Sequence, residues 1–358
     1  MTTNPQPVAE ALLSRVAGSP DVLVQKIDVS RDAALLVAID QKTYRAASFL
    51  DDRVLTAGVQ GAWVGYGRLA ASCAAIPNAR PLHFIFHAGH VGSTLISRLL
   101  EEAGGVLSLR EPLSLRLIAD AHDVLGKPES FLSEPAFFAL LDLHLRLWSR
   151  GYSDTTAVVL KATSICGRLA PAILSRLSSA RAIYVNVRAE PYLATLLAGQ
   201  NPIDLRGHAP ERIRRLVSHG VDSSPPLHAL SVGELAALSW LVESWSACDA
   251  LDAGGGRVAA VNFDTFLGNV EDGIGRVAQH LGVPHDAQFA QRAARSPVMT
   301  RYAKAPEHAY TPDLRAQVLA QSRAQNGREI NQGLLWLERT ARANAGAAAI
   351  INRTNGLA

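Results

Sequence analysis

The chain has 358 residues, of which 48% are hydrophobic and 19% are charged, and its formal net charge at pH 7 is +3. These values are typical of a globular protein and lie outside the range of disordered chains. Because the net charge is small, neither nucleic acid nor a membrane surface is expected as a partner. No run of about 18 uncharged apolar residues predicts a membrane span, and no secretory signal pattern is visible. We therefore expect a cytoplasmic protein.

Cysteine and histidine spacing points away from structural metal and disulfides. Cys73, Cys166 and Cys248 lie far apart and form no CxxC pair, which argues against a disulfide framework and a zinc site. His144 has no partner at the spacing of metal ligands. No metal is expected.

In chain order, three regions differ in pattern. Residues 1–80 mix amphipathic stretches with glycine-rich turns and predict an N-terminal extension packed on the core. Residues 81–345 alternate short apolar, β-branched runs with helical patterns, which is typical of an α/β domain with a parallel β-sheet flanked by helices on both faces. Residues 346–358 are weakly patterned, and we expect this tail to fray.

The elements of the α/β region can be placed from their patterns. Predicted strands cover 83–87, 105–109, 156–161, 181–187 and 257–263, and predicted helices cover 93–102, 135–148, 171–177 and 232–251. Trp240 and Trp245 on the last helix are interpreted as core residues. Residues 296–312 contain three prolines and little periodicity, so a long loop is predicted there, and long loops in compact domains are commonly functional lids.

The segment HFIFHAGHVGSTLISRLL, residues 83–100, carries the most specific local signal. A strand ends at His87, a turn with Gly89 and Gly92 follows, and Ser93 and Thr94 begin an amphipathic helix. Glycines let the backbone amides curl around an anion, and the helix N-terminus adds unpaired N–H groups. The alternative is an ordinary strand–turn–helix in which the hydroxyls only cap the helix. Without a GK[ST] signature, the turn is not a Walker A loop.

This turn resembles the first phosphate-binding loop of the sulfotransferases, which use 3′-phosphoadenosine-5′-phosphosulfate (PAPS). Segments 181–191, 257–267 with 277–282, and the loop around 301–304 are similar to later parts of the same family, in the same order. The resemblance covers about residues 81–310 and implies a P-loop NTPase-like sulfotransferase fold of the bacterial branch. It implies that the nucleotide is bound by Gly89, His90, Val91, Gly92, Ser93, Thr94, Leu95, Arg188, Thr195, Arg301 and Lys304.

The sequence departs from the family pattern at several of these positions. His90 stands where the family usually has a lysine, and Thr195 is one residue out of register with the family's serine. Neutral imidazole can donate one hydrogen bond but carries no full charge near neutral pH. His87, directly before the loop, is interpreted as a positioning residue rather than a catalyst.

Candidate catalytic groups follow the second and third predicted strands. Glu111, in an Arg-Glu-Pro segment that resembles the bacterial branch, is our candidate for the base that takes the acceptor proton. The alternatives are a pair with Arg110 or a cap for the helix that begins near Pro112. Lys161 ends the third strand and, with His90, could stabilise the leaving oxygen. The alternative for Lys161 is a surface ion pair.

The resemblance implies transfer of a sulfuryl group from PAPS to a hydroxyl, or an amine, of a small-molecule acceptor. Two alternatives stay open: an ATP-dependent P-loop phosphotransferase, which would need magnesium, and a sulfotransferase-like nucleotide-binding module without catalysis, favoured by His90 in place of lysine. The sequence does not identify the acceptor. It also leaves the oligomeric state open, with a homodimer among the alternatives.

Overall fold

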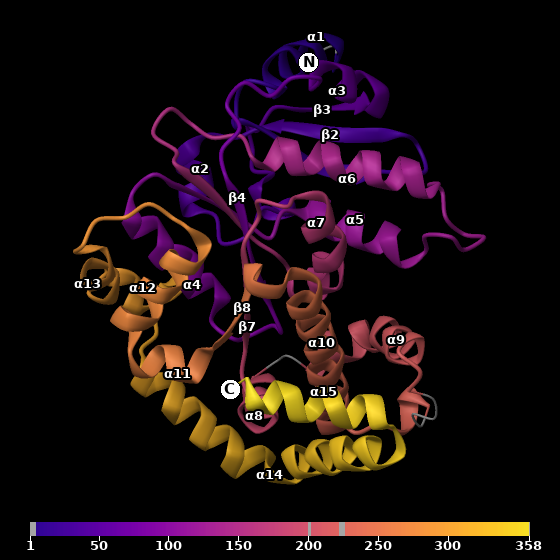
Figure 1. Ribbon diagram of the computed structural model, residues 1–358, viewed down its shortest axis with the longest axis vertical. Helices are drawn as coiled ribbons and strands as arrows, with labels where there is room; N and C mark the ends of the chain where they lie inside the picture. Colours follow the sequence, from indigo (N-terminus) through magenta and orange to yellow (C-terminus); the bar gives the residue numbers. More distant parts are fainter. Residues whose placement is uncertain (1–4, 200–201, 222–225, 358) are drawn as a thin grey trace.

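The computed structural model describes residues 5–199, 202–221 and 226–357, and its centre is one parallel β-sheet (Figure 1). The strands stand in the order β5 (Val106–Arg110), β6 (Ala157–Lys161), β4 (Leu82–His87), β7 (Ala182–Asn186) and β8 (Val258–Asn262), and every pair is parallel. The α/β fold with a parallel sheet is thereby confirmed. Each end of each predicted strand lies within one residue of the observed end.

Helices cover both faces of this sheet because the strand side chains alternate between two cores. Phe84, Phe86 and Tyr184 face one core, and Ile85 and Ile183 face the other. Helices α7 (Ala170–Arg176) and α10 (Val232–Gly254) cover the first face, and α4 (Ser93–Leu100) and α12 (Val270–Leu281) cover the second (Figure 1). The burial of both faces explains why the strands are continuous apolar runs.

The four predicted helices are present, as α4, α6 (Glu134–Trp148), α7 and α10. A reciprocal pair of hydrogen bonds between Ser231 and Glu234 caps α10. Trp240 and Trp245 are buried, as expected of core residues. The further helices of this region are α5 (Leu113–Asp123), α8 (Ala189–Leu197), α9 (Pro202–Ser218), α11 (Phe263–Gly268), α13 (Phe289–Ala294) and α14 (Pro312–Ala343). None of the described helices combines the length and hydropathy needed to cross a bilayer.

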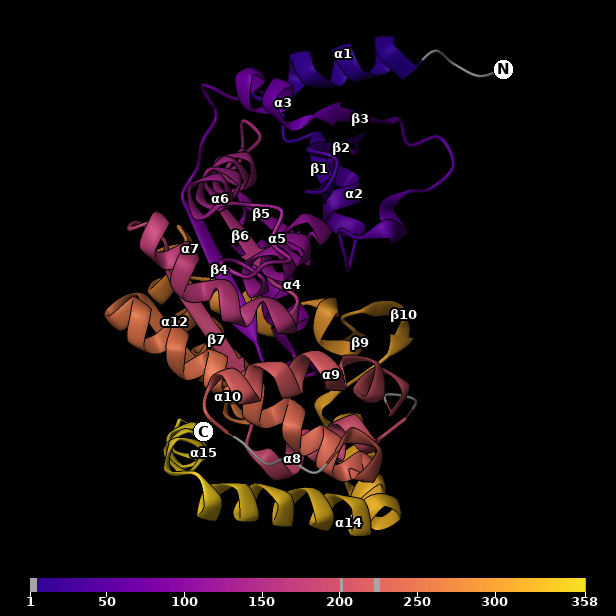
Figure 2. The ribbon, with the colours of Figure 1, turned by 90° about the vertical axis from the view of Figure 1, so that its right-hand side faces the viewer.

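Residues before the main sheet form a small unit at one end of the molecule (Figure 2). Strands β1 (Val22–Asp28), β2 (Ala33–Ala38) and β3 (Gly61–Gly65) make an antiparallel sheet, accompanied by α1 (Pro5–Val16), α2 (Gln41–Ala46) and α3 (Tyr66–Ser72). The unit shares one hydrophobic core with the first face of the main sheet. Buried Arg150 joins the two parts by donating to the carbonyls of Ser19 (2.7 Å) and Val22 (2.8 Å).

Two expectations about irregular segments are corrected. The tail expected to fray forms helix α15 (Ala345–Gly356), because Asn344 caps it, Ala347 and Thr354 are buried, and Arg353 pairs with Asp252 at 2.6 Å. The long loop expected at 296–312 is a short 3₁₀ turn followed by an antiparallel hairpin of β9 (Arg301–Tyr302) and β10 (Ala305–Ala309). Hydrogen bonds between backbone groups form this hairpin, and its strands are too short for their side chains to show a periodic pattern in the sequence.

Candidate active site

The loop after β4 lies where the strand order of the sheet reverses direction. From β4 the chain crosses to β5 at one edge, whereas from β7, which also pairs with β4, it continues to β8 at the other edge. In open α/β sheets, ligands bind outside the carboxyl ends of the strands at such a switch point. The topology therefore places residues 88–92 and Arg188, which follow β4 and β7, at the expected binding edge.

The loop itself has the backbone of an anion cradle. Gly89, His90 and Gly92 have φ values of +91°, +55° and +73°. A Cβ at Gly92 would lie 1.9 Å from the ring of Phe263, so only glycine fits there. Within the described part of the chain, the amides of residues 90–95 have no backbone acceptor. Successive free N–H groups at a helix N-terminus favour an anion.

Gly89 differs from its neighbours in the loop. Its amide donates to Nδ1 of His87 at 3.0 Å, so this N–H does not point toward an anion, and the row of free amides begins at His90. Since Nδ1 of His87 accepts, Nε2 carries the proton and donates to the carbonyl of Ala162 at 2.8 Å. Burial, together with nearby Lys161, lowers the pKa of His87 well below its ordinary value. Neutral His87 thus fixes the loop to the segment after β6.

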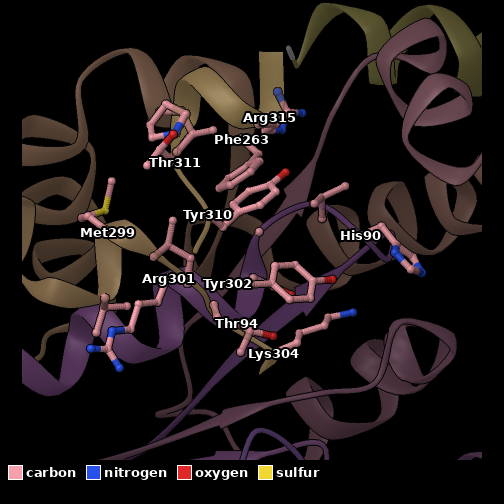
Figure 3. Close-up of a pocket in the computed structure, with 18 of the residues that line it drawn as sticks. His90, Thr94, Phe263, Met299, Arg301, Tyr302, Lys304, Tyr310, Thr311 and Arg315 are labelled. Atoms are coloured by element: carbon pink, nitrogen blue, oxygen red, sulfur yellow. The ribbon is translucent and has the colours of Figure 1, made fainter. Parts of the chain in front are cut away.

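One pocket gathers most of the residues expected to bind the nucleotide (Figure 3). It contains about 790 Å³ of space not occupied by atoms. Its walls come from the loop and first turn of α4, from α8, from the start of α11, and from the segment around the β9–β10 hairpin. The expected residues among its lining are His90, Val91, Gly92, Ser93, Thr94, Leu95, Thr195, Arg301 and Lys304. Four segments far apart in sequence therefore meet around one space.

The positive charge of this pocket comes from the hairpin and from Arg315 on α14, which pairs with Asp264 at 2.7 Å. Arg301 and Lys304 both line it, and Lys304 extends toward the side on which His90 lies (Figure 3). Desolvation lowers the pKa of His90, and the nearby positive charges of Lys304 and Lys161 lower it further. His90 is therefore a neutral imidazole at pH 7, and the full positive charges of the pocket are those of the hairpin and of Arg315.

Glu111 and Lys161 form a pair at the carboxyl ends of adjacent strands β5 and β6. Oε1 of Glu111 accepts a hydrogen bond from Nζ of Lys161, and the Glu111 amide donates to the Lys161 carbonyl at 2.7 Å. Lys161 is completely buried, and this burial lowers its pKa to about 8. The pair is therefore not a surface ion pair. Arg110 pairs with Glu101 instead of Glu111.

Three other expected residues, Glu111, Lys161 and Arg188, lie outside the lining of this pocket. Neither Glu111 nor Lys161 lines the pocket, and the Lys161 ammonium that was expected to reach a leaving oxygen is occupied by Glu111. Arg188 is exposed at the start of α8 and is not among the lining residues. Thr195 lines the pocket, and its hydroxyl donates to the carbonyl of Pro191 at 2.7 Å.

Sequence reasoning missed the aromatic and second basic parts of the pocket. Phe263, Tyr302, Tyr310 and Arg315 also line it, and Arg315 lies over the Phe263 ring with 5.3 Å between guanidinium carbon and centroid. Phe263 is the last residue of the strand predicted at 257–263, which is a usable signal. The tyrosines carry no such signal, because their position depends on how the hairpin folds back over the loop. Among the described residues, no group of three or more His, Cys, Asp or Glu side chains could hold a metal ion.

Comparison with known proteins gives matches among solved structures alone, since no family model and no curated protein matches the chain. A sulfotransferase domain from the curacin biosynthetic pathway aligns with 14% identity over 70% of this chain and 98% of that chain, at a TM-score of 0.36. A sulfotransferase from Alicyclobacillus acidocaldarius aligns with 16% identity over 71% and 96%, at a TM-score of 0.34.

A further alignment extends over more of the chain. A sulfotransferase from Mycobacterium avium aligns with 14% identity over 91% of this chain and 97% of that chain, at a TM-score of 0.34. At TM-scores of this size the alignments carry no argument of their own, so the functional proposal rests on the geometry of the site.

Proposed function

We propose that this protein is a PAPS-dependent sulfotransferase that moves a sulfuryl group to a hydroxyl, or less readily an amine, of a small-molecule acceptor. The observation that carries the proposal is the pocket in which the amides of residues 90–95 meet Thr195 and the cations Arg301 and Lys304. The motif resemblance names these residues too, together with Gly89 and Arg188, which do not line this pocket.

The chemistry of the lining suits a doubly phosphorylated adenosine. Free amides at the start of α4 can bind the 5′-phosphosulfate, and the charges of Arg301 and Lys304 suit a further phosphate. Phe263, Tyr302 and Tyr310 offer aromatic rings against which a flat base can stack. Bound PAPS would supply a sulfuryl group that is activated by its phosphate leaving group.

The residues around the loop would then divide the work of transfer. The acceptor oxygen forms a bond to sulfur while the bond from sulfur to the bridging oxygen breaks, and the acceptor proton must leave. Glu111 is our candidate for the base that takes this proton, because Lys161 engages Oε1 and Oε2 accepts no hydrogen bond from another described residue. His90 would donate its N–H to the bridging oxygen, which gains charge.

Nucleotide binding tests the donor assignment. We expect 3′-phosphoadenosine 5′-phosphate (PAP) to stabilise the protein against thermal unfolding without added metal, by about 2.7 kcal/mol at a concentration near 100 times its Kd. 5′-AMP, which lacks the 3′-phosphate, should stabilise much less. Arg188→Ala should reduce the difference between PAP and 5′-AMP, whereas Arg31→Ala, at an exposed arginine of the N-terminal unit, should not. Stabilisation by Mg-ATP and not by PAP would instead support a phosphotransferase.

Turnover tests the catalytic assignment. With PAPS and a panel of hydroxyl compounds, product should be detected by mass spectrometry as the gain of one SO₃ group. Glu111→Gln should lower kcat by about 100- to 10,000-fold, which is the usual contribution of a general base, and should leave PAP binding unchanged. A Glu111→Gln protein with full turnover would show that another group takes the proton. A protein that binds PAP but sulfates nothing would be a binding module.

A further inference from the structure

We propose that the acceptor carries a carboxylate or phosphate group, and that this anionic group binds Arg212 in a second pocket on the other side of His90. This inference rests on the proposed function, because it names the class of acceptor for the same transfer reaction. It is carried by Arg212 and its neighbours in a second pocket, whose lining shares only His90 with the nucleotide pocket.

The second pocket adjoins the first through the phosphate-binding loop. His90 lines both pockets, and Gly89, whose amide is turned away from the anion cradle, lines the second one. The other walls come from Thr163 and Ser164 after β6, from Arg116 on α5, and from α9. The pocket contains about 570 Å³ of space not occupied by atoms. An acceptor bound there would lie next to the loop that holds the donor.

Arg212 is the feature of this pocket that calls for a ligand. It lines the pocket and is only 7% exposed, yet its Nε and Nη1 atoms are buried without a hydrogen-bond partner among the described residues. Glu211 and Glu243 each pair with Arg215 through Oε1, at 3.3 and 3.1 Å, and their buried Oε2 atoms form no hydrogen bond with Arg212 or with any other described residue. Buried charged donors without acceptors are strongly unfavourable, so an oxygen-rich anion would satisfy them.

Arg116 is the second cation of this pocket, and His208 and Asp204 are its other titratable neighbours. Burial lowers the pKa of His208, which also lines the pocket, and the positive charges of Arg212 and Arg116 lower it further. His208 is therefore neutral at pH 7 and adds no positive charge. Asp204 also lines the pocket but is exposed to water, so solvent screens its repulsion of an anion. The guanidinium groups of Arg212 and Arg116 match the geometry of carboxylate and phosphate oxygens.

Binding of small anions tests the subsite without knowledge of the acceptor. Protein saturated with PAP, so that the donor pocket is filled, would be titrated with acetate and with inorganic phosphate, and chloride at equal ionic strength would serve as the reference. We expect an increase in Tm that saturates with acetate or phosphate and is absent with chloride. Arg212→Gln should weaken this anion binding at least about tenfold, since a hydrogen bond to a charged group contributes about 1.5–3 kcal/mol.

Two further variants keep the test decisive. Arg206→Gln, on the same helix but exposed and outside the pocket lining, should bind the anions as the parent protein does. Arg116→Gln should weaken binding too, and it replaces Arg212→Gln if that variant fails to fold. The larger effect of acetate or of phosphate tells which of the two groups the acceptor carries. Equal Tm values in acetate, phosphate and chloride would overturn the proposal, and failure to bind PAP would instead overturn the proposed function.

Discussion

At the scale of single residues, two candidate site residues hold a backbone conformation that side chains rarely adopt. His90 and Glu111 have φ values of +55° and +52°, and Asp32, at +50°, is the other non-glycine residue with positive φ in the described ranges. Such positions cost about 1 kcal/mol or more and persist where the surrounding structure or the function requires the side chain. The coincidence of strain with the candidate catalytic groups supports their role in the site.

Glycine at position 90 separates this strain from function. We expect His90→Gly to raise the free energy of unfolding by up to about 1 kcal/mol, because glycine accepts positive φ without strain, and to lower turnover, because the imidazole donor is lost. Asp32→Gly is the matched control, since Asp32 has the same φ and lies exposed in the N-terminal unit. It should gain stability with no change in turnover. Urea unfolding and the sulfation assay measure both, and unchanged turnover in His90→Gly would contradict a role for the imidazole.

The pH dependence of stability reports on Lys161. Its pKa in the fold is about 8, below the value of about 10.4 for an unperturbed lysine. Between these two values the unfolded chain holds a proton that the folded chain has released, so stability from this group rises with pH. From pH 8 to pH 10 we expect a gain of about 2 kcal/mol in the parent protein relative to Lys161→Met, measured by urea unfolding at both pH values. A difference between the two proteins that is constant with pH would show that Lys161 titrates normally.

At the scale of elements, one side chain couples the glycine loop after β4 to the neighbouring strand. His87 ends β4, accepts from the amide of Gly89 in the loop, and donates to the carbonyl of Ala162 after β6. The ring spans both contacts because its two nitrogens point in different directions. His87 thus fixes the loop to the sheet. The loop therefore keeps its shape without protein acceptors for the amides from His90 onward.

Two isosteric variants separate the contacts of His87. His87→Asn can keep an acceptor for the amide of Gly89, and His87→Gln can keep a donor for the carbonyl of Ala162. Each lost buried hydrogen bond should cost about 1–3 kcal/mol of stability. We expect His87→Gln, which frees the loop amide, to weaken PAP binding more than His87→Asn does. Calorimetric titration with PAP checks this order, and equal affinities would show that the loop keeps its shape without this bond.

At the scale of the whole molecule, the N-terminal unit is tied to the α/β domain and to the hairpin that lines its candidate pocket. Buried Arg110 donates to the carbonyls of Tyr44 (3.0 Å) and Ala47 (2.7 Å). On α4, Arg98 donates to Ser48 of the N-terminal unit and to the carbonyl of Ala303 in the hairpin, both at 2.9 Å. The hairpin that carries Arg301 and Lys304 is therefore held partly by the first residues of the chain.

Removal of the N-terminal unit should accordingly abolish a stable fold. We expect the fragment 81–358 to lose cooperative unfolding, because the shared core is opened and the buried guanidinium groups of Arg110 and Arg150 lose carbonyl acceptors. In the full chain, Arg98→Ala should retain the fold, since Arg98 is partly exposed, and should weaken PAP binding by loosening the hairpin. Thermal unfolding and PAP titration measure the two effects. A fragment that unfolds cooperatively and binds PAP would contradict this coupling.

The sequence by itself determined the main sheet, the loop and the order of the site segments. Buried parallel strands need apolar residues on both faces, and a glycine turn before a helix needs residues of particular types. Both requirements concern residues that are neighbours in the sequence, so both can be recognised there. The glycine turn before α4 could be read in this way, and the resemblance named Thr195, Arg301 and Lys304, which lie in the lining of the same pocket.

Only the tertiary structure decided which side chains share a space and which are already engaged. The pairing of Glu111 with Lys161, the amide of Gly89 turned toward His87, and the unpartnered guanidinium of Arg212 arise from contacts between segments distant in the chain. Helix α15 likewise depends on distant contacts, because its small side chains are stabilised in a helix by packing against α10 and α14. Such contacts depend on long-range packing, which leaves no periodic trace in local sequence.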